Sequence, residues 1–208
     1  MDNFVITISR CCGAGGTTIG KRLAADLGVS FYDKNLLHLA SEDSGINEEL
    51  FANADEKLKG SLLYKVSRKV YQGELIPPES EDFTTNENLF NYQAKVLKEL
   101  AASESYVVIG RCADFILKDH PKLVRIFLYA PYEDCVAHEK EKHSISAKEA
   151  QWHIDRTDKH RSAFYKYHTG HDWMEMENYD ICINTGAVDY EKTVEIIEFY
   201  VHSMLGLQ

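Results

Sequence analysis

A glycine-rich segment near the start of the chain has the residue types and spacing of a phosphate-binding loop. The apolar residues 4–9 predict a strand, and an amphipathic helix is expected from about residue 19 to a glycine at position 28. Backbone N–H groups and a helix N-terminus would then surround one small concavity, which favours an anion. The candidate phosphate-binding residues are Arg10, Gly13, Ala14, Gly15, Gly16, Thr17 and Thr18.

Three interpretations of this segment remain open. The P-loop pattern G-x-x-x-x-G-K-[ST], placed on residues 10–17, retains Gly15 and Thr17 but has Arg10 for the first glycine and Gly16 for the lysine. In that pattern the hydroxyl of Thr17 would be the Mg²⁺ ligand. A dinucleotide-binding loop is the second interpretation, because an aspartate follows about 20 residues later, although its third glycine is missing. A glycine-rich turn without a ligand is the third.

Two further sets of charged residues could act on a bound phosphate. Arg111 directly follows an apolar strand, where its guanidinium could bind phosphate in a bidentate manner or pair with a structural carboxylate. Asp155, Asp158 and Arg161 have helical spacing, so that Asp158 and Arg161 share a face that Arg156 could also reach. Such a run is either a solvated helix face or, because it lies between two strands, a lid over the phosphates.

The elements that would position these residues form an α/β pattern. Five apolar segments, at residues 4–9, 30–32, 106–110, 124–130 and 179–184, alternate with helical patterns, which predicts a five-stranded parallel sheet with helices on both faces. A Ser146–Glu149 capping box begins a long polar helix, and the last helix begins near Asp189. Ligands bind at the carboxyl ends of such strands, where the glycine-rich segment, Asp33 and Arg111 would meet.

Composition excludes several classes of protein. The 208 residues carry a net charge of −10 without a basic run, which argues against a nucleic-acid partner. No signal pattern or long apolar run predicts secretion or a membrane span. The five cysteines lack C-x-x-C spacing, so neither a disulfide framework nor a zinc site is expected. This use of cysteine predicts a cytoplasmic location. Surface positions are expected for His138, His143, His168 and His171.

Five segments together resemble the cytidylate kinase-like family, which belongs to the P-loop nucleoside monophosphate kinases. They cover nearly the whole chain, and residues 42–103 match least. The segments are Thr7-Ile8-Ser9-Arg10 with Gly13-Ala14-Gly15-Gly16, Phe31-Tyr32-Asp33-Lys34, Gly110-Arg111-Cys112-Ala113-Asp114, Thr157-Asp158-Lys159-His160-Arg161, and Tyr179-Asp180-Ile181-Cys182-Ile183-Asn184.

The resemblance implies a three-layer P-loop fold with ATP and Mg²⁺ as cofactors. It divides the chain into a core (1–41, 104–145 and 174–208), a helical insert that binds the monophosphate (42–103) and a lid (146–173). The glycine-rich segment would hold the donor phosphates, and Asp33 and Arg111 would face the acceptor. Arg156, Asp158 and Arg161 would be the catalytic residues of the lid, with Arg161 on the transferring phosphoryl group.

Two departures from the family's pattern bear on activity. Gly16 stands where cytidylate kinases have a loop lysine, and Ile109 stands where they have an aspartate before the Gly-Arg pair. Arg10 or Lys21 could supply the missing charge. The expected function is phosphoryl transfer from ATP to a nucleoside monophosphate, with CMP or dCMP as acceptor, by a monomer or homodimer. The alternatives are a non-catalytic nucleotide-binding regulator and a kinase for another small metabolite.

Overall fold

A five-stranded parallel sheet forms the centre of the computed structural model, which describes residues 3–57 and 73–206. The strand order is β2-β3-β1-β4-β5, and every neighbouring pair is parallel. In the register, Ile6 lies between Val107 and Val124. The strands are β1 (Val5–Arg10), β2 (Ser30–Tyr32), β3 (Tyr106–Ile109), β4 (Leu123–Tyr129) and β5 (Ile181–Asn184). All five predicted strands are confirmed, with ends that differ by one or two residues.

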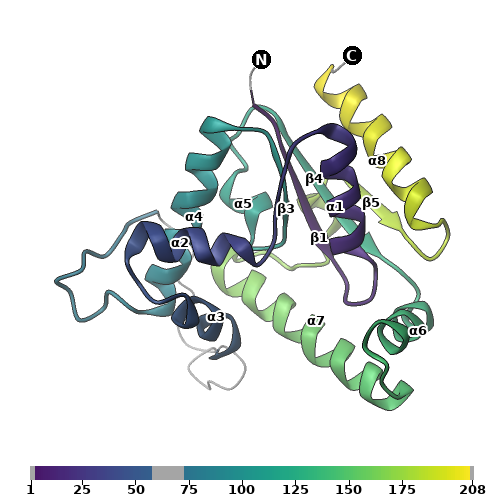
Figure 1. Ribbon diagram of the computed structural model, residues 1–208, viewed down its shortest axis with the longest axis horizontal. Coiled ribbons are helices and arrows are strands. Elements are labelled where there is room, and N and C mark those ends of the chain that lie inside the picture. The colour runs from purple at the N-terminus through teal and green to yellow at the C-terminus, as the bar shows by residue number, and fades with distance from the viewer. Residues whose placement is uncertain (1–2, 58–72, 207–208) are drawn as a thin grey trace.

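Helices connect the strands and cover both faces of the sheet (Figure 1). The predicted capping box of Ser146 with Glu149 begins α7, and the side chain of Asp189 accepts a hydrogen bond from Lys192 N at the start of α8. The helices are α1 (Gly16–Leu27), α2 (Asn35–Ser44), α3 (Glu48–Lys57), α4 (Asn86–Ser103), α5 (Ala113–Ile116), α6 (Tyr132–His143), α7 (Ala147–Thr169) and α8 (Tyr190–Leu205).

One face of the sheet packs against α1 and α8. Ile6 and Ile8 of β1 and Ile126 of β4 are fully buried there against Leu23 of α1 and Ile197 of α8. Because the strands are parallel and covered, their apolar runs point alternately into two separate cores. This packing fixes the turn from β1 into α1 at the carboxyl end of the central strand.

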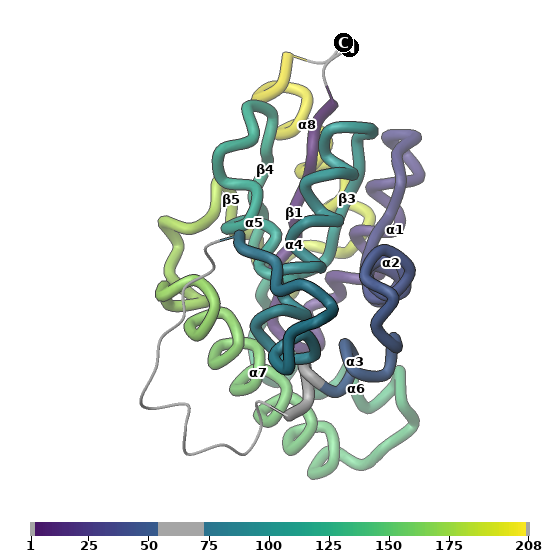
Figure 2. Tube along the Cα trace, turned by 90° about the vertical axis from the view of Figure 1, so that its left-hand side faces the viewer, coloured from purple at the N-terminus to yellow at the C-terminus, as the bar shows by residue number. Residues whose placement is uncertain are grey.

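The other face packs against α4 and α5, with α2 outside α4 (Figure 2). Val5 and Val108 point into this second core, where they join Leu97 of α4 and Leu36 of α2. Of the predicted insert at 42–103, α4 therefore packs into the core on the sheet, while residues 58–72 lie outside the described residues. The predicted division into core, insert and lid stays a prediction.

The long helix α7 crosses the carboxyl ends of the strands, with α6 beside its first half (Figure 1). Its last turns are anchored in the second core: Tyr165 is buried, and the ring of His168 stacks on Phe90 at 3.8 Å between centroids. His168 is 3% exposed, so its expected surface position was wrong, because α7 packs on α4 there. None of the helices in the described ranges is both long and apolar enough to cross a membrane.

Candidate functional site

The turn between β1 and α1 has backbone geometry that only glycine adopts easily. Gly13 and Gly15 have φ angles of 87° and 77°, in the left-handed region. Each is also enclosed: a Cβ on Gly13 would lie 2.7 Å from the Cα of Cys135, and one on Gly15 would lie 2.6 Å from Cε1 of Tyr190. Gly15 is the N-cap of α1 and has no side chain that could accept hydrogen bonds from the first amides of the helix. These amides are therefore available to an anion bound in the loop. The loop is thus shaped for an anion.

Three other elements hold this loop in place. The amide of Cys12 donates to both carboxylate oxygens of Asp158 on α7, at 2.8 and 3.1 Å. The carbonyl oxygen of Gly13 lies 2.8 Å from Nδ1 of His138 on α6, and Thr185 donates to the carbonyl of Ala14 at 3.1 Å. These bonds join the loop to α6, α7 and the segment after β5, and they fix its shape before any ligand arrives.

Arg10 extends from the end of β1 across the start of α1. A Cβ on Gly16 would lie 2.7 Å from Cγ of Arg10, and a Cβ on Gly110 would lie 2.5 Å from its Nη1. Burial and the nearby charge of Arg161 lower the pKa of Arg10 to about 9. The guanidinium therefore stays charged at neutral pH, but beside other cations and with little water, which makes an anionic ligand favourable there.

Arg111 lies on a turn of unusual backbone conformation after β3. Gly110, Arg111 and Cys112 have successive φ angles of 69°, 63° and 53°. The left-handed conformation costs about 1–2 kcal/mol at each non-glycine residue. Strained backbone of this kind is typical of functional sites, and here it turns the chain sharply from β3 into α5, next to the end of β1.

On α7, Asp158 and Arg161 form a unit with the loop. Nη1 of Arg161 donates to Oδ1 of Asp158 at 3.1 Å and to the carbonyl of Arg10 at 3.2 Å. Burial raises the pKa of Asp158, and the charge of Arg161 counteracts that shift. Asp158 thus joins the amide of Cys12 to Arg161 and holds that guanidinium at the end of β1.

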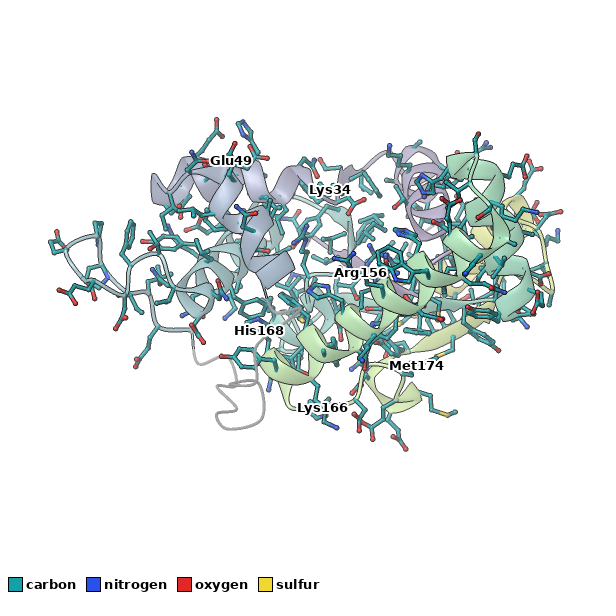
Figure 3. All side chains as sticks on the ribbon, turned by 90° about the horizontal axis from the view of Figure 1, so that it is seen from below. Lys34, Glu49, Arg156, Lys166, His168 and Met174 are labelled. Atoms are coloured by element: carbon teal, nitrogen blue, oxygen red, sulfur yellow. The ribbon has the colours of Figure 1, made fainter. Side chains whose placement is uncertain are left out.

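Arg156 and Lys34 bring further positive charge from opposite sides of the same opening (Figure 3). The guanidinium carbon of Arg156 lies 4.8 Å from the ring centroid of Trp152, whose side chain is 60% exposed. Lys34 follows Asp33 at the end of β2. Lys166, by contrast, projects from the other side of α7, where it pairs with Asp172 at 2.6 Å (Figure 3).

These side chains line a cavity of about 560 Å³ at the carboxyl ends of the strands. Its size is ordinary for a small-molecule site. The described residues that line it include five Lys or Arg side chains and one acidic side chain, in a protein whose net charge is −10. The charge is concentrated where an anion would bind, because clefts focus the electrostatic field. The charged lining residues are Arg10, Asp33, Lys34, Arg111, Arg156 and Arg161.

Thr17 and Asp33 offer oxygen atoms for a hard cation. Thr17 Oγ1 donates to Oδ2 of Asp33 at 3.3 Å, at the first turn of α1. A hydroxyl and a carboxylate at the edge of a phosphate site are suitable ligands for Mg²⁺, which prefers few protein oxygens together with waters and phosphates. The residues present therefore fit the ion.

The structure brings most of the sequence-predicted site residues together. Arg10, Asp33, Arg111, Arg156 and Arg161 line the cavity, and Asp158 lies behind Arg161. Thr17 contacts Asp33, while Thr18 is exposed on the next position of α1. The remaining loop residues, Gly13, Ala14, Gly15 and Gly16, form the turn beside Arg10.

Sequence reasoning missed several lining residues, among them Lys34, Trp152 and His153, and left one question open. Lys34 and Trp152 both line the cavity; Lys34 was signalled by its place after Asp33 at a strand end. Trp173 is buried as expected of a packing residue, whereas Trp152 is exposed. Of the two cations considered for the missing loop lysine, Lys21 lies over the ring of Phe31 at 5.9 Å, and Arg10 lies in the cavity wall.

Comparisons with known proteins agree with this architecture. The sequence profile of the cytidylate kinase-like family matches residues 5–187. A cytidylate kinase of Methanopyrus kandleri is 23% identical over 212 residues, which cover 98% of this chain and 95% of that protein. The crystal structure of an uncharacterised protein from Eubacterium ventriosum has a TM-score of 0.71 at 24% identity, over 97% of this chain and 99% of the other.

A shikimate kinase from Bacteroides thetaiotaomicron shares the fold at a greater distance. Its TM-score is 0.52 at 16% identity, over 98% of this chain and 99% of the other. Together with the strand order, these likenesses confirm the predicted three-layer α/β fold of the P-loop kinase type.

Proposed function

The chain belongs to the cytidylate kinase-like family, and from that premise we propose that it transfers the γ-phosphoryl group of ATP to a nucleoside monophosphate. CMP or dCMP is the proposed acceptor. The observation that carries the proposal is the cavity itself: five Lys or Arg side chains surround it beside a glycine-rich loop, at the carboxyl ends of β1 and β3. Phosphoryl transfer needs little from a protein beyond positioning and neutralisation of charge, which is what this set of side chains can supply.

The donor phosphates would bind to the loop and the first turn of α1. The guanidinium of Arg10 supports this assignment, because Arg10 lines the cavity and its stem lies beside Gly16, at the first amides of α1. In this arrangement Arg10 would supply the charge that the missing loop lysine provides in the P-loop pattern. Its long stem crosses Gly16, the position that the lysine would occupy.

The acceptor would bind on the side of β3 and α2. Arg111, at the end of β3, would pair with the acceptor phosphate, and Asp33, at the end of β2, would face the acceptor nucleotide. Arg156 and Arg161 would contact the transferring phosphoryl group from α7, with Asp158 as the positioning residue that holds Arg161. Preorganised donors of this kind stabilise charge that develops in the transition state.

Thr17, with the carboxylate of Asp33 beside it, would hold Mg²⁺. The ion would supply positive charge that neutralises part of the charge on the phosphates. The chain's own part is to keep the hydroxyl and the carboxylate together, and α1 and β2 supply these two groups from neighbouring elements. Asp33 would thus lie between donor and acceptor.

The test is ATP-dependent ADP formation with Mg²⁺ against a panel of acceptors. The panel holds the ribo- and deoxyribonucleoside monophosphates, together with shikimate and gluconate because kinases of similar fold act on such compounds. Arg161→Ala is the test variant and Lys166→Ala, on the opposite side of the same helix, is the matched control. Turnover with CMP or dCMP that collapses only in Arg161→Ala supports the proposal.

Two other outcomes would replace the proposal. Turnover with shikimate or gluconate alone would make the protein a kinase of another small metabolite. ATP binding that raises the melting temperature without turnover on any acceptor would identify a nucleotide-binding regulator, since ligand binding stabilises the folded state regardless of chemistry.

A further inference from the structure

A second cluster of reactive side chains lies between the loop, α6 and α7, where His153 also borders the cavity. Cys12 comes from the loop after β1, Glu139 from α6 and His153 from the first half of α7 (Figure 1). The thiol sulfur, a carboxylate oxygen and an imidazole nitrogen all lie within 4.8 Å of one another. We propose that these three residues bind one divalent transition-metal ion of the Zn²⁺ class. The proposal does not rest on the proposed kinase activity.

The carboxylate of Glu139 is the centre of the cluster. Its side chain is only 3% exposed, and three positively charged or protonatable groups surround it. Nε2 of His143 lies 3.3 Å and Nε2 of His153 lies 3.5 Å from the same oxygen, Oε2, while Nζ of Lys142 lies 3.8 Å from Oε1. A buried carboxylate requires such countercharge or a metal. Two imidazole nitrogens beside one oxygen of this buried carboxylate, with the thiol of Cys12 within 4.8 Å of the carboxylate, favour the metal.

The three ligand atoms lie close enough together for one ion to be reached by all of them. Ligand atoms at the usual Zn–S and Zn–N distances lie about 3.5 Å apart around the ion, so the three atoms here need to move by only about 1 Å to close on it. Water or, after a change of rotamer, His143 would complete the coordination, because His143 is one helical turn from Glu139 on α6 and its Nε2 lies 3.3 Å from that carboxylate.

The donor types select the metal. Thiolate and imidazole ligands suit Zn²⁺ and Co²⁺, whereas Mg²⁺ and Ca²⁺ require oxygen ligands. This site is therefore chemically distinct from the Thr17–Asp33 pair. Binding would displace the thiol proton of Cys12 to solvent, because the thiolate is the ligand.

The surroundings are suited to a metal site. An apolar cluster consisting of Cys135, Val136, Ala150 and Ile154 packs with Cys12, and an apolar shell limits the access of water to a bound ion. A bound ion would join the loop, α6 and α7 through one centre. It would then add to the bond between the amide of Cys12 and Asp158, which joins the loop to α7 on the cavity side.

The experiment titrates metal-free protein with Co²⁺ and with Zn²⁺ in competition with a chromophoric chelator. We expect one equivalent of metal, a thiolate-to-Co²⁺ charge-transfer band and a higher melting temperature. Cys12→Ser should abolish the charge-transfer band. Glu139→Gln and His153→Asn should each weaken Zn²⁺ binding more than about tenfold, since loss of an outer-shell partner alone already costs that much. Cys182→Ser, an exposed thiol, and His202→Asn are the controls and should bind metal like the original protein.

Several results would overturn the proposal. Metal binding that is unchanged in both Cys12→Ser and His153→Asn would place the metal elsewhere. Absence of saturable binding of one equivalent, or displacement of Co²⁺ by millimolar Mg²⁺, would exclude a thiolate–imidazole site. If Cys12→Ser fails to fold, His153→Asn decides the question, because His153 is about half exposed on α7 and its imidazole can be lost without opening the core.

Discussion

The side chain of Arg10 occupies the space that a side chain at position 16 would need. A Cβ on Gly16 would lie 2.7 Å from Cγ and 3.3 Å from Cδ of Arg10. The two departures from the P-loop pattern, an arginine in place of the first glycine and a glycine in place of the lysine, are therefore one spatial arrangement. The guanidinium of Arg10 reaches the site from the end of β1, and the absence of a side chain at Gly16 on α1 gives it the space to do so.

Arg10→Ala should lower ATP affinity without a comparable loss of stability. A hydrogen bond to a charged group contributes about 1.5–3 kcal/mol, so the dissociation constant for ATP should rise by roughly 10- to 150-fold. Removing the guanidinium also relieves its repulsion with Arg161, which opposes the loss of packing in the ATP-free protein. Calorimetric titration with ATP and urea unfolding without it measure the two effects. Unchanged ATP affinity would exclude Arg10 from donor binding.

Moving the charge back to position 16 tests the same arrangement in reverse. Gly16→Lys alone should destabilise the protein, because its Cβ collides with the stem of Arg10. The double variant Arg10→Gly, Gly16→Lys has the space for a lysine and should bind ATP more tightly than Arg10→Ala. Equal affinities in these two variants would contradict the exchange of positions. The measurement is ATP titration of all three proteins under one salt condition.

Arg161→Ala should reduce kcat by about 10²- to 10³-fold, the usual loss for one preorganised donor to transition-state charge. KM for ATP should change much less. Arg161→Lys should recover little of the activity, because an ammonium lacks the planar fork by which a guanidinium holds Asp158 and Arg10 through Nη1 and keeps other N–H groups for a phosphoryl oxygen. Steady-state kinetics with Lys166→Ala as the control test this. A similar loss in Lys166→Ala would show that α7 is merely sensitive to substitution.

Asp114 should make the protein less stable as the pH rises. Burial raises the pKa of this carboxyl to about 6, against the opposing hydrogen bond from Tyr165. Because the folded pKa lies above the unfolded value of 3.8, its contribution is complete below that value and is lost as the pH rises through 6. A shift of this size corresponds to about 3 kcal/mol. Urea unfolding at pH 4 and pH 7.5 should show most of this decline, and Asp114→Asn should remove most of it. An equal decline in both proteins would exclude Asp114 as its source.

Gly15→Ala should destabilise the fold more than Gly28→Ala. Both glycines have positive φ angles, 77° and 65°, and so share a backbone cost of about 1–2 kcal/mol on substitution. A Cβ at Gly28 meets nothing within 4 Å, whereas one at Gly15 collides with the ring of Tyr190. Thermal unfolding of the two variants measures the difference. In the background of Tyr190→Ala, the additional loss at Gly15 should disappear; if it persists, the collision is not its cause.

Local patterns predicted the frame of the molecule because each depends on neighbours in the sequence. Apolar runs gave the five strands, and the pair Ser146 and Glu149 marked the start of α7. The strand end at Ile109 is one residue earlier than predicted, since Gly110 already has a φ of 69°. The convergence of Arg10, Arg111 and Arg161 followed from the rule for strand ends together with the family resemblance.

Such local patterns could not predict contacts that depend on the three-dimensional fold. The spacing of Arg10 and Gly16 gives no sign that one fills the other's space, because that depends on the left-handed turn between them. Cys12 lies more than a hundred residues from Glu139 and His153, so only the packing of α6 and α7 against the loop brings them together. The pair Glu139 and His143, four residues apart on one helix, was the single local signal of that cluster.

Helix α7 is held in the second core at its carboxyl end, and its first half packs on α6 and the loop. Tyr165 is bonded to Asp114 and His168 is stacked on Phe90, while Ala147 lies 18 residues away, about 27 Å along the axis. Arg161 lies four residues from Tyr165 and Arg156 nine, so Arg161 is nearer to this anchor by about 7 Å along the axis. Because Ala150 and Ile154 pack with α6 and the loop, the first half of α7 can shift only together with them. A shift of that assembly about Tyr165 would move Arg156 and Trp152 farther than Arg161, which makes Arg161 the better fixed of the two guanidinium groups.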